Sequence, residues 1–161
     1  MPEFLKRPFK LYLDTSVPSH LFADDVPEKK NITESLFDSE IRSQYEFYVS
    51  VVVLREIERA PFHMQKELKE RIIGIPILEL SKDADHLAEA YIEAGVLSRA
   101  SVEDAQHVAI ATINNLDAVV SWNFKHLVNL RRIKLINAVN EQMGYKHIEI
   151  VSPHEVINYE I

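Results

Sequence analysis

The strongest constraint on the fold is that short, apolar, β-branched runs alternate with longer amphipathic segments along the whole chain. Five runs have the length and composition of strands: 10–13, 46–50, 76–80, 118–121 and 146–151. Four segments space their apolar residues as helices do: 32–44, 51–59, 62–73 and 82–96. A fifth helix opens at 102. This alternation predicts an α/β sandwich around a largely parallel sheet, with residues 1–161 forming a single domain.

The ends of the predicted helices carry polar residues that suit caps. Ser81 and Ser101 stand where a hydroxyl caps a helix N-terminus, and Asn114 or Asn115 suits the left-handed conformation that ends a helix. Two further segments are expected to be less regular: 23–31, a polar loop, and 138–143, one or two helical turns.

The composition excludes several kinds of protein. No cysteine is present, so disulfides and thiolate metal sites are impossible. The glycine motifs that bind dinucleotides or cradle phosphates in P-loops are absent. No apolar stretch is long enough to span a bilayer or to form a signal peptide, so we expect a cytoplasmic protein that does not bind membranes.

The net charge of −7 disfavours a scaffold for duplex DNA, because such proteins bind by neutralising phosphates. An acidic chain can still act on nucleic acid if some of its carboxylates hold a divalent cation, which reverses the local field. The charge therefore leaves a metal-dependent enzyme open.

Polar side chains follow several of the predicted strands. Asp14 comes directly after the first strand, Glu56 lies on the helix that leaves the second, and Asn123 follows the strand 118–121. The carboxyl ends of parallel strands share one edge of a sheet, so these side chains point to the same place. Asp104, on the first turn of the helix that opens at 102, joins them if that helix begins at the same edge.

Gathered carboxylates repel one another and raise each other's pKa, and Mg²⁺ or Mn²⁺ relieves that conflict. Such an ion can also activate water for attack on a phosphodiester. Each residue has a plainer interpretation as well. Asp14 and Asn123 could belong to turns, Glu56 could lie on a solvated helix face, and Asp104 could support the cap of its helix.

These residues lie in segments that resemble PIN-domain ribonucleases, the group that includes the toxin subunits of many toxin–antitoxin pairs. The matching segments occur in the family's order: LYLDTS (11–16), YVSVVVLREIE (48–58), EDAQHVAIA (103–111), AVVSWNFKHL (118–127) and INAVNEQMGYKHIEIVSPHEV (136–156). The resemblance implies an α/β/α sandwich with about five parallel strands, a site for Mg²⁺ or Mn²⁺, RNA as substrate, an antitoxin partner and a homodimer.

The resemblance also implies a role for each site residue. Asp14, Glu56 and Asp104 take the positions of the acidic metal ligands, and Asn123 takes a fourth position that is commonly Asp. The hydroxyl that the family often has near the metal falls on Thr15, with Ser16 as the second choice, and Ser121 could act similarly. Because Asn123 carries no charge, the site should favour one ion over two, and activity should be weaker or absent.

The sequence thus leaves two main hypotheses: a metal-dependent endoribonuclease in which Asn123 orients water or substrate, and a PIN-like binding module with little catalysis. A dehalogenase-like phosphatase fits less well, because Ser16 stands where that chemistry needs a second acid.

The remaining polar residues are ambiguous. His107 is expected to be a packing or hydrogen-bonding residue, and Trp122 a core or edge anchor with base stacking as the alternative. Lys125 with His126 could be a solvated loop pair or a phosphate contact. The basic run Arg131, Arg132 and Lys134 reads as a solvated face, with RNA contact as the alternative.

Overall fold

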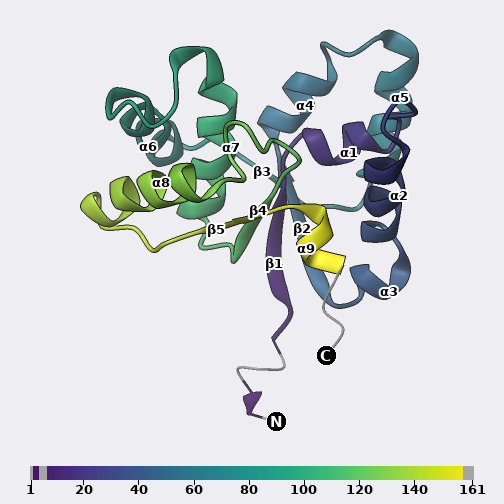
Figure 1. The fold of residues 1–161 in the computed structure, drawn as a ribbon, viewed down its shortest axis with the longest axis horizontal. Helices are drawn as coiled ribbons and strands as arrows, with labels where there is room; N and C mark the ends of the chain where they lie inside the picture. The colour runs from purple at the N-terminus through teal and green to yellow at the C-terminus, as the bar shows by residue number, and fades with distance from the viewer. Residues whose placement is uncertain (1, 4–6, 158–161) are drawn as a thin grey trace.

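The computed structural model describes residues 2–3 and 7–157. Its strands are β1 (Phe9–Leu13), β2 (Tyr45–Ser50), β3 (Ile77–Leu78), β4 (Ala118–Val120) and β5 (Glu149–Val151) (Figure 1). Its helices are α1 (Ser16–His20), α2 (Pro27–Leu36), α3 (Ser39–Arg42), α4 (Val51–Ile57), α5 (Phe62–Arg71), α6 (Lys82–Glu93), the 3₁₀ helix η2 (Arg99–Ser101), α7 (Val102–Ile113), α8 (Leu130–Gln142) and α9 (Pro153–Ile157).

The strands form one parallel sheet in the order β3-β2-β1-β4-β5. Leu11, Tyr12 and Leu13 of β1 are all buried, as is every residue of β4. Such unbroken buried runs occur where helices cover both faces of a parallel sheet. The predicted fold class, an α/β/α sandwich with about five parallel strands, is confirmed.

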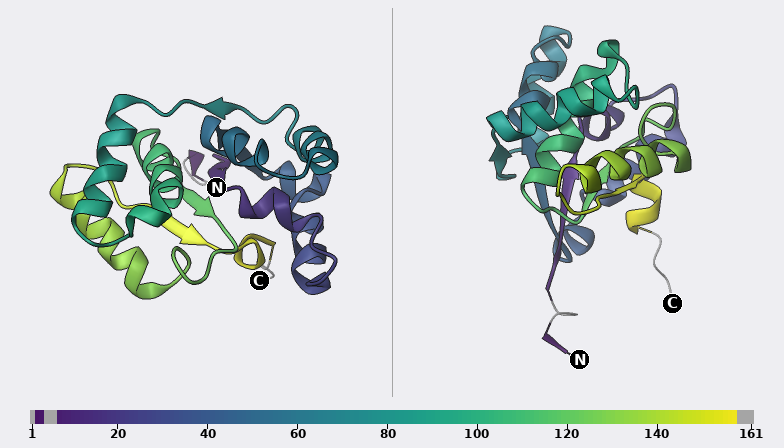
Figure 2. Two further views of the ribbon diagram at one scale, coloured as in Figure 1. Left: turned by 90° about the horizontal axis from the view of Figure 1, so that it is seen from above. Right: turned by 90° about the vertical axis from the view of Figure 1, so that its left-hand side faces the viewer.

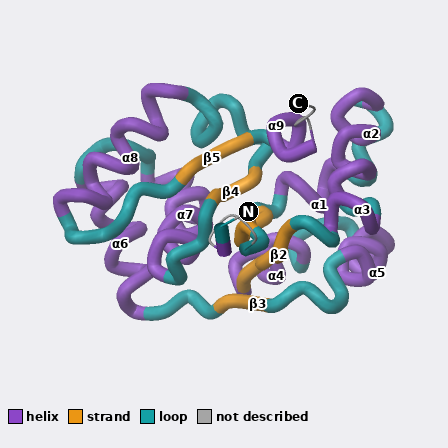
Figure 3. The backbone as a smooth tube through the Cα atoms, turned by 90° about the horizontal axis from the view of Figure 1, so that it is seen from below, coloured by secondary structure: helices purple, strands orange, loops and turns teal. Residues whose placement is uncertain are grey.

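Helices cover the two faces unequally. Helices α6, α7 and α8 lie on one side of the sheet, and α1, α2, α3, α5 and α9 lie on the other (Figure 2, Figure 3). Helix α7 packs against both α6 and β4. Its small buried residues, Ala105 and Ala109, let its backbone approach the sheet closely.

The apolar residues form a continuous core on both sides of the sheet. Leu13, Val49 and Val120 are fully buried on three neighbouring strands. Burial of a side chain of this kind contributes roughly 1.5–3 kcal/mol. None of the helices in residues 2–3 and 7–157 combines the length and the hydropathy that a bilayer crossing requires.

The segment 23–44 is organised differently from the prediction. Helix α2 begins at Pro27, inside the expected polar loop, because the fixed backbone angle of proline suits the first turn of a helix. The expected helix 32–44 is interrupted: α2 ends at Leu36, and Asp38 adopts an extended conformation before α3.

Helix α8 is much longer than the one or two turns predicted over 138–143. It begins at Leu130, and the side chain of the preceding Asn129 caps it by accepting a hydrogen bond from the Arg132 amide at 2.9 Å. The run of basic residues hid its amphipathic pattern. Arg131 and Lys134 are exposed, which both interpretations of this run allow, whereas the Arg132 guanidinium donates to the Val96 carbonyl.

The predicted caps have mixed outcomes. The Ser81 hydroxyl accepts from the Ala84 amide at 3.1 Å, which confirms the cap of α6, and Asn115 adopts a φ of 54° as predicted. The cap by Ser101 is wrong, because its side chain makes no cap hydrogen bond. Residues 99–101 form the 3₁₀ helix η2 instead, and its backbone leads directly into α7.

Candidate active site

The strand order creates a switch point between β1 and β4. From β1 the chain goes outward to β2 and β3, then returns to place β4 on the other side of β1. Connections therefore leave the two central strands in opposite directions, which opens a crevice at their carboxyl ends where ligands bind in open α/β sheets. Asp14 follows β1 at this point, and its amide donates to the Val120 carbonyl of β4 at 3.2 Å.

The predicted site residues meet in this crevice. A hollow of about 300 Å³ is lined by Asp14, Thr15, Ser16, Ser19, Glu56, Asp104, His107 and Asn123. Ser121 stands behind it, with its Oγ 3.5 Å from that of Ser16. Lys125 is exposed and is not among the lining residues. Residues from the turn after β1, from α1, α4 and α7, and from the loop after β4 thus line one hollow.

Asp14 is fixed at the bottom of the crevice and is only 3% exposed. Its Oδ1 accepts from the Ser16 amide at 3.1 Å and from the Ser16 hydroxyl. The Ser16 Oγ in turn accepts from the Trp122 amide at 2.9 Å, so Ser16 ties Asp14 to the loop after β4. Burial raises the pKa of Asp14, and the charge of His107 offsets this only in part.

Glu56 is held by two side chains rather than lying on a solvated face. Its Oε1 accepts from the Thr15 hydroxyl at 2.9 Å and lies 2.5 Å from His107 Nε2. Burial alone would raise the pKa of Glu56, but the hydrogen bond and charge of His107, with the Thr15 hydroxyl, outweigh it. The pKa is therefore lowered, and Glu56 is a carboxylate at neutral pH.

A buried chain of hydrogen bonds supports His107. The Tyr12 hydroxyl lies 2.6 Å from His107 Nδ1 and 2.7 Å from the Ser50 Oγ, which also accepts from the Val52 amide as the cap of α4. Burial raises the pKa of Tyr12 well above its usual value, so the phenol keeps its proton. Burial alone would lower the pKa of His107, but the hydrogen bond and charge of Glu56 outweigh it and raise the pKa. The charged ring donates from Nε2–H to Glu56 and from Nδ1–H to the Tyr12 hydroxyl, which donates to Ser50.

Asp104 carries the clearest sign of crowded charge. Burial and the repulsion of Asp14 raise its pKa to about 6, while its Oδ2 accepts from Asn123 Nδ2 at 3.2 Å. Its position on the first turn of α7 places it at the positive end of the helix dipole.

Asn123 uses both ends of its amide. Its Oδ1 accepts from the His126 amide at 3.0 Å, and its Nδ2 donates to Asp104. These neighbours fix the orientation, because an amide N–H needs an acceptor and a carboxylate offers only lone pairs. The neutral side chain therefore braces Asp104 without adding a charge.

The donor set suits a hard divalent cation, which prefers carboxylate oxygens. Three carboxylates face one hollow, and two of them have raised pKa values that a cation would reverse. Within the described residues, no group of three acidic or His side chains stands ready to hold an ion as placed. Asp14, Glu56 and Asp104 are thus the residues that would hold it, after side-chain adjustment.

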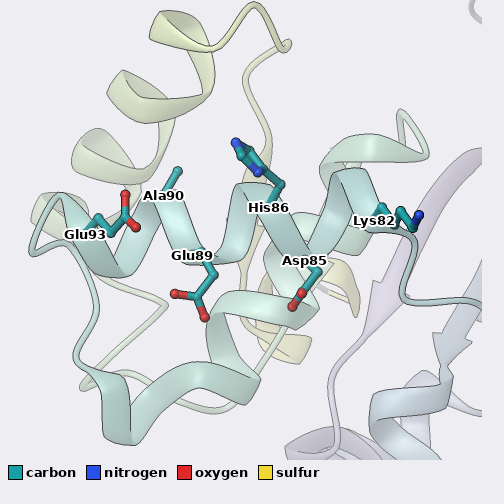
Figure 4. Close-up of a pocket in the computed structure, with 6 residues that line it drawn as sticks. All are labelled: Lys82, Asp85, His86, Glu89, Ala90 and Glu93. Atoms are coloured by element: carbon teal, nitrogen blue, oxygen red, sulfur yellow. The ribbon is translucent and has the colours of Figure 1, made fainter.

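A second hollow, of about 340 Å³, lies along α6 (Figure 4). Its lining comes from this one helix: Lys82, Asp85, His86, Glu89, Ala90 and Glu93. Glu89 pairs with Arg99 at 2.6 Å. No strand end contributes to this hollow, so the crevice between β1 and β4 is the better candidate.

Some participants gave little signal in the sequence. Ser19 lines the hollow, yet it has no spacing relation to the acids. Tyr12 has the sequence context of an ordinary strand residue. The only indication of a hydrogen-bond partner is that its hydroxyl lies within a run of apolar residues. His107 does have the hydrogen-bonding role predicted for it. Trp122 is an anchor, as predicted: it is 6% exposed and donates from Nε1 to the Thr33 hydroxyl at 2.9 Å.

No protein-family profile and no curated protein matches the sequence. Solved structures are similar in fold. A toxin–antitoxin complex from Klebsiella pneumoniae has a TM-score of 0.58 at 16% identity, covering 94% of this chain and 99% of that chain. VapBC2 from Rickettsia felis, bound to a promoter DNA fragment, has a TM-score of 0.55 at 12% identity, covering 89% and 98%.

A third structure is VapC20 from Mycobacterium tuberculosis, a toxin that cleaves the sarcin–ricin loop. It has a TM-score of 0.56 at 13% identity, covering 86% of this chain and 98% of that chain. At these identities the likeness concerns the fold. The chain therefore has the PIN-like α/β/α fold of VapC toxins, as its resemblance to PIN-domain proteins implied.

Proposed function

We propose that this protein is a Mg²⁺- or Mn²⁺-dependent endoribonuclease that hydrolyses RNA phosphodiester bonds. The observation that carries the proposal is the convergence of Asp14, Glu56 and Asp104 on one hollow at the switch point of the sheet. The raised pKa of Asp104 supports it, because a protein gains from such crowding only if a cation or another positive group joins the carboxylates.

The residues of the site have different roles in this proposal. Asp14, Glu56 and Asp104 would hold the ion through carboxylate oxygens, and the ion would activate water and neutralise charge on the phosphoryl group. His107 and Thr15 hold Glu56 in place, Ser16 holds Asp14, and Asn123 holds Asp104. Thr15 and Ser16 would thereby act on substrate through the carboxylates they position, and Ser121 through its contact with Ser16.

The test is RNA cleavage with Mg²⁺ or Mn²⁺ by wild type, Asp14→Asn and Asp104→Asn. We expect each variant to lose at least a hundredfold in rate, because each removes a charge from the ion's ligands. Asp85→Asn, an exposed acid on α6, is the matched control and should cleave like wild type. Equal rates in all four proteins would contradict the mechanism.

The second candidate is a binding module with little turnover, and Asn123 favours it. Its Oδ1 already accepts from the His126 amide and its Nδ2 faces Asp104, so this side chain brings no negative charge to an ion. Asn123→Asp distinguishes the two candidates. A large gain in cleavage identifies a weakened enzyme, whereas persistent inactivity with intact Mn²⁺ binding identifies the module.

The toxin structures of the same fold support a role as the toxin subunit of a toxin–antitoxin pair. We further propose that the protein is a cytoplasmic homodimer. Expression of the chain alone should then arrest growth, and co-expression with the product of an adjacent small gene should restore it. Light scattering of the purified chain tests the dimer.

A further inference from the structure

Phe124 is a large aromatic side chain left in water beside the candidate active site. It is 46% exposed, and its neighbour in the chain, Asn123, lines the acidic hollow. Single exposed hydrophobic side chains are common on protein surfaces, so this ring points to a ligand only together with its place beside the site and the groups held around it.

The loop that carries Phe124 is held by hydrogen bonds. The amides of Leu127 and Val128 donate to the Asn123 carbonyl at 3.0 and 2.9 Å. Asn129 Nδ2 donates to the carbonyls of Phe124 and Lys125 at 3.0 and 3.1 Å. A ring presented on a fixed loop loses little freedom when a ligand binds.

A lysine from helix α2 completes the surface around the Phe124 ring. Lys29 of α2 places its Nζ 5.2 Å from the centre of the Phe124 ring and 5.4 Å from that of Trp122. The two rings meet edge to face with centres 6.0 Å apart, and Trp122 is anchored to Thr33 of α2. One exposed ring and one ammonium group are thus held together next to Trp122, whose amide donates to Ser16 in the lining of the hollow at 2.9 Å.

We propose that Phe124 and Lys29 form a stacking subsite for an unpaired RNA base next to the scissile phosphodiester. The proposal rests on the proposed function, since it takes RNA as the substrate. Base stacking on aromatic rings is a main source of affinity for single strands, and lysine neutralises the adjacent phosphate. An exposed ring next to Asn123 of the acidic hollow, with an ammonium group beside it, matches a nucleotide better than an apolar peptide.

Trp122 is the chain's single tryptophan and its ring contacts that of Phe124, so its fluorescence responds to a ligand that stacks there. The probe is a short oligouridylate, titrated into the full chain carrying Asp104→Asn to prevent cleavage, and compared with an oligomer of the same length that lacks bases. We expect the bases to change the Trp122 signal. Adding Phe124→Leu should weaken binding about tenfold, and Phe124→Tyr should preserve it.

The controls separate this subsite from the catalytic proposal. Phe9→Leu, the same change at a ring that is 56% exposed at the far end of β1, should leave binding unchanged. Lys29→Gln should weaken the binding of both oligomers. The subsite is overturned if Phe124→Leu binds oligouridylate as tightly as its parent, or if the oligomer without bases binds as tightly as the one with bases. In either case the ring serves another partner, even if wild type cleaves RNA. Binding through Phe124 without cleavage by wild type overturns the nuclease and keeps the subsite.

Discussion

The hydroxyl of Tyr12 connects the strand β1 to His107, which in turn supports Glu56. Tyr12→Phe keeps the ring in the core but removes the hydrogen-bond partner of His107 Nδ1 in a buried position. A buried polar group without a partner costs about 1–3 kcal/mol. We expect that loss in the free energy of unfolding and a lower cleavage rate, because Glu56 loses its fixed orientation. Chemical denaturation and single-turnover assays measure both, and an unchanged rate would show that His107 needs no second partner.

Asp104 should destabilise the fold when no cation is present. Its pKa in the folded state is about 6 against an ordinary 3.8, so its stability contribution rises as the pH falls from about 6 towards 4. At pH 7.5 in EDTA, Asp104→Asn should therefore be more stable than wild type. The gain should be about 1–2 kcal/mol, less than the full pKa difference because solvent reaches part of the carboxylate.

Denaturant unfolding at two pH values checks the origin of that gain. At pH 4.5 the wild-type carboxyl is protonated and resembles the amide, so the difference between the two proteins should shrink. A gain that is the same at both pH values would assign it to packing rather than to charge.

At the scale of elements, strands and helices differ in how well the sequence predicts them. β1, β2 and β4 were predictable because buried parallel strands are short runs of apolar residues. Helix α8 was not, because Arg131, Arg132 and Lys134 occupy its first turns and its buried face includes the polar Asn137 and Asn140. Asn137 bonds the amide and carbonyl of Ile148, a tertiary contact that no local pattern contains.

Asn129 couples the start of α8 to the loop that carries Phe124. Asn129→Ala removes the helix cap and the two bonds to the loop carbonyls. The lost cap should cost about 1 kcal/mol. Ser81→Ala removes a similar cap from α6 and should cost about the same. The hydrogen bond of this cap does not involve the loop that carries Phe124. Only Asn129→Ala should also weaken RNA binding, as fluorescence titration can measure; equal binding by both variants would separate α8 from the loop.

For the whole molecule, the position of the candidate site was predictable while its internal contacts were not. Asp14, Glu56 and Asn123 were placed by their order after strands, since parallel strands share one edge. That Asn123 donates to Asp104, and that His107 reaches Tyr12, depends on how α7 sits against β1 and β4. Such packing arises between segments far apart in the chain, so spacing along the sequence does not reveal it.

The crowding of three carboxylates makes the stability of the whole molecule depend on divalent cations. A ligand that binds only the folded state stabilises it, by about 2.7 kcal/mol at a hundredfold excess over its dissociation constant. We expect Mn²⁺ to raise the melting temperature of wild type at pH 7.5 and to do so much less at pH 5, because protons compete for Asp104. Asp14→Asn and Asp104→Asn should lose most of the shift, and Asp85→Asn should keep it. A shift of the same size in all four proteins would place the cation elsewhere, and the absence of any shift in wild type would remove the ion from the proposed mechanism.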